Sequence, residues 1–143
     1  MLRNLSYNDQ LIRREIDELV GKPLSIWERI KRGGSGSPKL LIVESSPEIN
    51  ALLSVDNRRR LGNIEIRPKG IIFGFRSRLE GYGLIAPFYK ITVYKGQSEV
   101  YSMFTDSGFV KFEAASKDRP IHEFMKQLLS LKTLQSPTRI EDL

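Results

Sequence analysis

The chain contains no cysteine, and this absence excludes disulfide bonds, thiolate nucleophiles and cysteine-bound metal ions. It contains a single histidine, His122, so a metal site or a catalytic pair built from several histidines is excluded too. We therefore expect no metal, no cofactor and no catalytic residues, and we favour a protein that is not an enzyme. A chain without thiols suits a reducing compartment, which predicts a cytoplasmic location.

Long hydrophobic runs are also missing. The longest purely aliphatic run covers residues 40–43, far below the roughly 20 residues that a membrane-spanning helix needs. Residues 1–10 carry Arg3 and Asp9 among polar side chains and lack the apolar stretch of a secretory signal. The sequence therefore predicts no transmembrane segment and no export.

The overall composition is that of an ordinary folded domain, with 143 residues, 40% hydrophobic and 28% charged. Residues 33–38 are glycine, serine and one proline, which favours a flexible linker. This linker would divide the chain into an N-terminal helical arm (1–32) and a main α+β domain (39–135). We interpret residues 136–143 as a polar tail.

Hydrophobic periodicity predicts the secondary structure. Apolar residues at helical spacing predict a helix over 8–20. Alternating apolar and polar residues predict a hairpin over 64–76, strands at about 87–95 and 98–104, and a last strand at 109–113. Connections this short require antiparallel pairing. Residues 47–55 fit either a strand or a helix capped by Ser46, and we favour the helix.

The strongest helical pattern lies near the end of the chain. Asp118 or Ser116 can cap this helix, and an apolar stripe along it must cover another element: Ile121, Phe124, Met125, Leu128 and Leu131. We expect an α+β fold, an antiparallel β-sheet or partly open barrel of about five to seven strands covered by the C-terminal amphipathic helix, with an N-terminal helix. This order of elements resembles that of pleckstrin-homology-type barrels.

Three short motifs resemble known sites. Asp106, Ser107 and Gly108 resemble the catalytic triplet of aspartic proteases, and residues 108–112 resemble the end of the RNP1 segment of RNA-recognition motifs. Residues 33–39 resemble a phosphate-binding loop but are followed by a strand rather than a helix. We interpret the three as a turn, a strand with core residues Val110 and Phe112, and the linker.

Positive charge is concentrated in the middle of the chain. The net charge is +6, and residues 22–95 alone carry fourteen Lys and Arg against six Asp and Glu. Arg76 and Arg78 lie two residues apart, which predicts that both point to one face of a strand. We infer an anion-binding patch. Its candidate residues are Arg58, Arg59, Arg60, Arg67, Lys69, Arg76 and Arg78.

These features favour a non-catalytic binding or scaffolding domain whose basic surface recruits an anionic partner, either an acidic protein segment or a lipid headgroup. One alternative is a nucleic-acid-binding protein that uses residues 58–60 and exposed aromatic side chains. Another is a small enzyme or ligand carrier with a pocket between the sheet and the C-terminal helix. The oligomeric state stays open.

Overall fold

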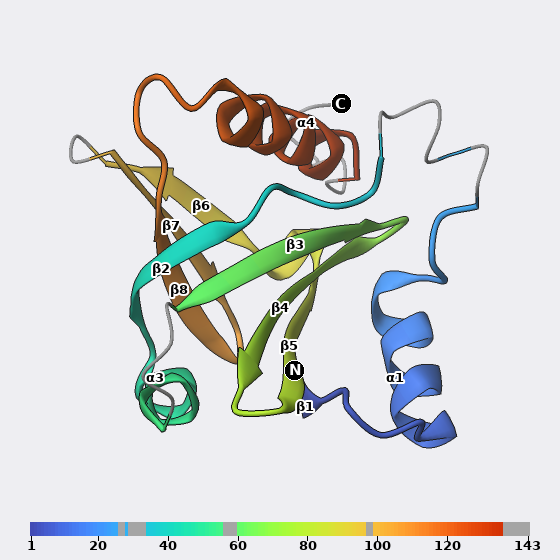
Figure 1. Cartoon of the computed structure of the whole chain (residues 1–143). Helices are drawn as coiled ribbons and strands as arrows, with labels where there is room; N and C mark the ends of the chain where they lie inside the picture. Colours follow the sequence, from blue (N-terminus) through green and yellow to red (C-terminus); the bar gives the residue numbers. More distant parts are fainter. Residues whose placement is uncertain (26–27, 29–33, 56–59, 97–98, 136–143) are drawn as a thin grey trace.

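The computed structural model describes residues 1–25, 28, 34–55, 60–96 and 99–135 (Figure 1). Within these residues the chain forms an eight-stranded antiparallel sheet and three α-helices, which confirms the predicted α+β class. The strands are β1 Leu2–Asn4, β2 Leu40–Ser45, β3 Leu61–Arg67, β4 Gly70–Ser77, β5 Glu80–Pro87, β6 Thr92–Lys95, β7 Val100–Thr105 and β8 Gly108–Glu113. The helices are α1 Gln10–Val20, α3 Pro47–Ser54 and α4 Arg119–Gln135, with a short 3-10 helix, η1, at Phe88–Lys90.

Two antiparallel meanders share strand β2. The first residues of β2 pair with β3, whereas its last residues pair with β8. The register shifts between Ile42 and Glu44, and an irregularity of this kind bends a strand and increases its twist. The strand order is β1-β5-β4-β3-β2-β8-β7-β6, so the sheet curves around one core and ends at the edge strands β1 and β6.

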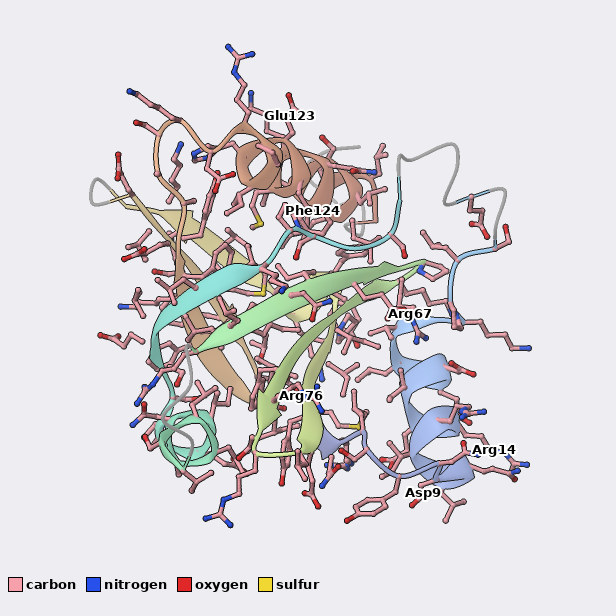
Figure 2. All side chains as sticks on the ribbon, in the orientation of Figure 1. Asp9, Arg14, Arg67, Arg76, Glu123 and Phe124 are labelled. Carbon is pink, nitrogen blue, oxygen red and sulfur yellow. The ribbon has the colours of Figure 1, made fainter. Side chains whose placement is uncertain are left out.

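The core lies between the inner face of the curved sheet and α4. The rings of Phe73 and Phe112 lie 6.1 Å apart between their centroids, and both side chains are fully buried. The predicted stripe of α4 packs here: Ile121, Phe124, Met125 and Leu128 are buried, and Leu131 is partly buried against them. Figure 2 shows Phe124 on the side of α4 that faces the sheet and Glu123 on the opposite side. Each such buried side chain contributes about 1.5–3 kcal/mol to folding.

Helix α1 covers part of the outer face of the sheet. It begins at Gln10 because the carboxylate of Asp9 accepts hydrogen bonds from the backbone N–H groups of Leu11 and Ile12. Its residues Ile16 and Val20 pack on Ile72 of β4 and Ile85 of β5, forming a second hydrophobic cluster. The helix predicted over 8–20 is therefore confirmed, and it packs directly on the sheet.

Three strands differ from the prediction. The strand expected at 87–95 is wrong in its first half, because η1 occupies Phe88–Lys90 and only Thr92–Lys95 is extended. Strand β5 comes earlier, at Glu80–Pro87, where residues 83–87 are all buried and no alternation marks it. Strand β1 was not predicted either. It is only three residues long and is defined by its pairing with β5.

Residues 47–54 form α3, which confirms the helix over the strand. Ser46 precedes it but does not cap it. Its hydroxyl accepts the backbone N–H of Phe109 at 3.3 Å and so attaches the start of α3 to β8.

The predicted linker, 33–38, is described from Gly34 onward. Ser37 donates its backbone N–H to the carbonyl of Ile64, and Ile66 donates to the carbonyl of Ser35, so this segment runs along β3. The division into an arm, linker, main domain and tail stays a prediction. None of the helices in the described part of the chain combines the length and the apolar character needed to cross a bilayer.

Candidate functional site

The structure places the predicted anion-binding residues at the two ends of the β3–β4 hairpin. Arg67 and Lys69 lie at the turn between the strands, whereas Arg60, Arg76 and Arg78 lie at the opposite end. Figure 2 shows Arg67 beside α1, apart from Arg76. Six extended residues separate the two ends, on the order of 20 Å. One small anion could not contact both groups. Two further candidates, Arg58 and Arg59, fall outside the described residues.

Arg67 is neutralised by its neighbours. Its guanidinium contacts the carboxylates of Asp17 in α1, at 3.4 Å, and Glu65 in β3, and donates a hydrogen bond to the carbonyl of Gly21 at 2.9 Å. The Arg67 side chain is 11% exposed. These contacts hold α1 against the sheet and leave little of the guanidinium for an external anion.

The cations at the opposite end also have local roles. Arg60 donates to the side chain of Asn50 at 2.8 Å, which joins the start of β3 to α3. Arg76 is exposed and donates to the carbonyl of Leu79. The expectation that Arg76 and Arg78 share a strand face is wrong. Strand β4 ends at Ser77, and Arg78 has φ 58° in the turn that follows, so strand alternation does not govern it.

A different group of cations surrounds a pocket between the sheet and α4, which we call the α4 pocket. It has a volume of about 450 Å³ and lies where the end of the β6–β7 hairpin approaches the first turns of α4 (Figure 1). Its lining residues are Lys95, Tyr101, Ser116, Arg119, His122, Glu123 and Lys126. Glu123 has the one carboxylate among these lining residues, and a second carboxylate, that of Glu99, accepts the backbone N–H of Ser116 at 3.2 Å. Lys95, Arg119 and Lys126 form no ion pair with a described residue.

Local geometry explains why these residues converge. Arg119, His122, Glu123 and Lys126 follow the spacing i, i+3, i+4, i+7, so they share one face of α4 while the apolar stripe occupies another. Lys95 pairs with Tyr101 across β6 and β7, and its ammonium lies 5.7 Å from the centre of the Tyr101 ring. The spacing on α4 was visible in the sequence, but the approach of Lys95 depends on the fold.

His122 and Tyr101 form the floor of the α4 pocket. His122 Nε2 lies 2.8 Å from the carbonyl oxygen of Ala115, which can only accept, so Nε2 carries the proton. Nδ1 then accepts the hydroxyl of Tyr101 at 2.8 Å when the ring is neutral. Burial raises the pKa of Tyr101 and keeps this hydroxyl protonated. Both ring nitrogens of the histidine are occupied, so His122 is not a free catalytic base.

A second cavity, of about 360 Å³, lies between α1 and the outer face of β3 and β4. Its floor is apolar, with Ile12, Ile16 and Ile72, and its rim carries charges of both signs. One of these rim charges is Arg67, which is already paired. This cavity therefore shows no preference for an anion.

The short motifs have structural roles. Residues 105–108 form the β7–β8 turn as interpreted, and Asp106 pairs with Lys90 at 3.2 Å. Slight burial disfavours the Asp106 carboxylate, but the hydrogen bond from Lys90 and the nearby amino group of Met1 outweigh this effect and lower its pKa. Val110 and Phe112 are buried in the core, as the strand interpretation predicted.

No three His, Asp or Glu side chains of the described residues converge to form a metal site. Comparison of the chain with protein-family models, with curated proteins and with solved structures gave no match.

Proposed function

We propose that this protein is a non-catalytic binding domain that holds an anionic group of a partner in the α4 pocket. The observation that carries the proposal is the convergence of Lys95, Arg119 and Lys126 on one concave site with a single carboxylate among its lining residues. Opposite charges across such a site attract a partner and fix its position.

Two features of the pocket favour binding over catalysis. A hydrolytic or acid–base site needs at least two groups that can exchange protons in different roles. The α4 pocket has one carboxylate, Glu123, and a histidine whose two nitrogens are occupied. The small enzyme or ligand carrier with a pocket at this position is therefore the weaker alternative.

The partner that we favour is an acidic segment of another protein. The three cations come from two elements, with Lys95 on the edge strand β6 and the other two on α4. An edge strand offers backbone groups to a polypeptide, which a lipid headgroup cannot pair with in the same way. A lipid headgroup is the other anionic partner to be tested.

A likeness to pleckstrin-homology-type barrels is part of the proposal. What supports it is the order of elements from β2 onward, two antiparallel meanders followed by the C-terminal helix. A cytoplasmic location, favoured by the lack of cysteine, also belongs to the proposal.

The test compares two charge-reversal variants of the full chain. K95E/R119E/K126E reverses the pocket, and K22E/K39E/K69E reverses three exposed lysines elsewhere with the same change of net charge. The probe is a capped hexaglutamate peptide at low ionic strength, followed by backbone amide shifts of the ¹⁵N-labelled protein. We expect shifts centred on residues 95 and 119–126, and at least about tenfold weaker binding by the pocket variant, which corresponds to 1.4 kcal/mol.

Several outcomes would reject the proposal. Equal loss of binding in the two variants would mean that only net charge matters. Shifts centred away from α4, or no shifts at all, would show that the pocket does not hold the anion. Vesicles containing phosphatidylserine provide a further comparison. If they bind through the same cations and hexaglutamate does not, the partner is a lipid headgroup and not an acidic protein segment.

Nucleic-acid binding is the second alternative, and exposed aromatic side chains favour it. Tyr94 is 60% exposed and Phe104 is 37% exposed on the outer face of β6 and β7. A single-stranded oligonucleotide that shifts the amides of these two residues, with affinity falling steeply as salt rises, would support it. Binding unaffected by salt would exclude it.

A further inference from the structure

We propose that the free edge of β6 binds its partner as an added β-strand and that this strand alternates acidic and apolar residues. The inference rests on the proposed function, since the acidic side chains enter the α4 pocket. It adds the conformation of the partner and its sequence pattern.

Strand β6 ends the sheet. Its one neighbour among the described strands is β7, whereas the corresponding edge of β5 at the other end is paired with β1. An unpaired edge presents a row of backbone N–H and C=O groups that can pair with another chain.

The register shows which backbone groups of β6 point outward. Gly96 donates its N–H to the carbonyl of Val100 at 3.0 Å, directly next to the Lys95–Tyr101 pair. Hydrogen-bonded and non-bonded pairs alternate along an antiparallel ladder. Lys95 and Val93 therefore belong to the non-bonded class, and their N–H and C=O groups point away from β7.

Side chains on the inner side of this edge favour acidic partner residues. A residue that pairs with Lys95 on an added strand lies about 4.5–5.5 Å from it between Cβ atoms, on the same face. Lys95 lines the α4 pocket together with Arg119 and Lys126. An Asp or Glu at that position is placed against positive charge. The other inner-face residue of β6 is Val93, which packs against the main core, so the acidic side chains of the added strand belong at its Lys95 end.

Side chains on the outer side favour apolar partner residues. Tyr94 contacts Phe104 in an edge-to-face arrangement with ring centroids 5.9 Å apart, and Phe104 contacts Phe109 at 5.5 Å. These rings form a row across β6, β7 and β8, with Tyr94 and Phe104 exposed. An apolar side chain beside Tyr94 on an added strand would extend the row and be removed from water.

A lysine on a short edge strand is also a common means of preventing aggregation. Such a role would require Lys95 alone. It does not explain why Lys95, Arg119 and Lys126 converge or why the aromatic row continues to the edge. The two explanations differ in what binds, so a binding experiment separates them.

The experiment uses the full chain and a capped eight-residue peptide that alternates Glu and Val. A matched peptide has four Glu followed by four Val, with the same composition and charge. Two further peptides carry N-methyl groups, on the amides of all Glu or of all Val. Only alternate amides of a strand face its neighbour. In an antiparallel added strand these are the amides of the residues paired with Val93 and Lys95, which are the Glu residues of the peptide. Methylation at Glu should therefore abolish binding, whereas methylation at Val should be tolerated.

We expect the alternating peptide to bind at least about tenfold more tightly than the block peptide. It should also slow hydrogen exchange at the amides of Val93 and Lys95. If only one of the two methylated peptides loses binding, strand addition is supported. Loss of binding by the peptide methylated at Val would indicate that the added strand is parallel to β6. Equal binding of all four peptides would overturn the inference.

The two proposals fail in distinguishable ways. If all four peptides bind equally, and the K95E/R119E/K126E variant binds none of them, the pocket binds anions but β6 adds no strand. If the alternating peptide protects Val93 and Lys95 while this variant binds it as well as the unmodified chain does, strand addition holds and the pocket is not the anion site. If the protein self-associates without any peptide and the same two amides become protected, the strand added to β6 comes from a second copy of the chain.

Discussion

Arg67 joins α1 to β3 through its guanidinium group, although its sequence context suggested a surface cation. Its partners come from three separate positions, Asp17, Gly21 and Glu65. A guanidinium with fixed donors suits such a junction, because several acceptors can be satisfied at once. Charge alone therefore does not tell an anion-binding arginine from a structural one.

Replacing Arg67 by Met tests this structural role. The change keeps most of the apolar length of the side chain but leaves two acidic neighbours and a backbone carbonyl without their donor. We expect a loss of about 1–3 kcal/mol of unfolding free energy, measured by urea denaturation. The control is Lys69→Met, at an exposed position in the same hairpin, which should change stability by no more than about 0.5 kcal/mol. Equal effects of the two substitutions would contradict the assignment.

Gly70 lies where β4 and β5 approach each other too closely for a side chain. A Cβ atom at this position would lie 2.2 Å from the carbonyl oxygen of Ala86 and 2.7 Å from the Cα of Pro87. Backbone atoms cannot rotate away as a side chain can, so strands must shift to make room.

We expect Gly70→Ala to cost about 1–3 kcal/mol or to prevent folding. Gly81→Ala is the matched control, because the nearest atom to its Cβ would be the hydroxyl of Ser6 at 3.9 Å. Thermal unfolding followed by circular dichroism compares the two. A Gly70→Ala protein as stable as the Gly81→Ala protein would show that β4 and β5 leave room for a side chain at this position.

At the scale of elements, α1 and α4 are attached by different cores. Helix α4 packs into the large cluster inside the curved sheet, whereas α1 packs on the outer face through a smaller cluster of four buried residues, two from α1 and two from the sheet. A smaller buried surface is opened at a lower free energy. Helix α1 should therefore open without the sheet unfolding.

Ile16→Ala tests the separate opening of α1. Removing this buried side chain should cost about 2–4 kcal/mol at the contact between α1 and the sheet. Amides of α1 should then exchange with solvent at least about tenfold faster, while those of β3 and β4 keep most of their protection. Leu11→Ala, at a position 70% exposed on the same helix, should change the exchange rates of neither α1 nor the sheet. Equal acceleration in α1 and the sheet would mean that they unfold as one unit.

At the scale of the whole molecule, two carboxylates attach the N-terminal segment to the hairpins. The hydrogen bond from Tyr7, and then that from Asn4, lower the pKa of Glu80 below its ordinary value of 4.5. The pKa of Asp106 is lowered from 3.8. A lowered pKa in the folded state stabilises the fold above the unfolded-state pKa, and this contribution is lost as pH falls through the folded-state value.

We expect stability to depend little on these groups above about pH 5 and to fall as both carboxylates become protonated. The double variant E80Q/D106N should unfold at a lower temperature than the unmodified chain near neutral pH. It should also lose less of its melting temperature on acidification to about pH 3, because the two linked groups no longer titrate. An unchanged loss on acidification would show that other carboxylates cause it.

Much of the fold was predictable from local pattern, and the failures have physical causes. The helices at 10–20 and 119–135 follow apolar spacing within the segment itself, and so does the hairpin of β3 and β4. Strand β5 was missed because Leu84, Ile85 and Ala86 are buried on both faces, the first against the main core and the second beneath α1. A strand covered on both sides loses the alternation by which a strand is recognised.

The α4 pocket was only half predictable. The spacing of Arg119 and Lys126 predicts that they share a helical face, but both lie outside residues 22–95, which carry the largest excess of positive charge. Lys95, the one pocket cation within that range, reaches α4 because the β6–β7 hairpin and the last helix meet across the end of the sheet.

The sequence by itself determined the α+β class, the antiparallel pairing of neighbouring strands and the face with which α4 covers the core. These properties depend on residues a few positions apart, so the order of side chains is enough to specify them. Only the tertiary structure decided that Arg67 is paired and that Lys95, Arg119 and Lys126 converge. Burial of the apolar faces determines how the helices and strands pack. The positions of charged side chains that are distant in the sequence follow from that packing.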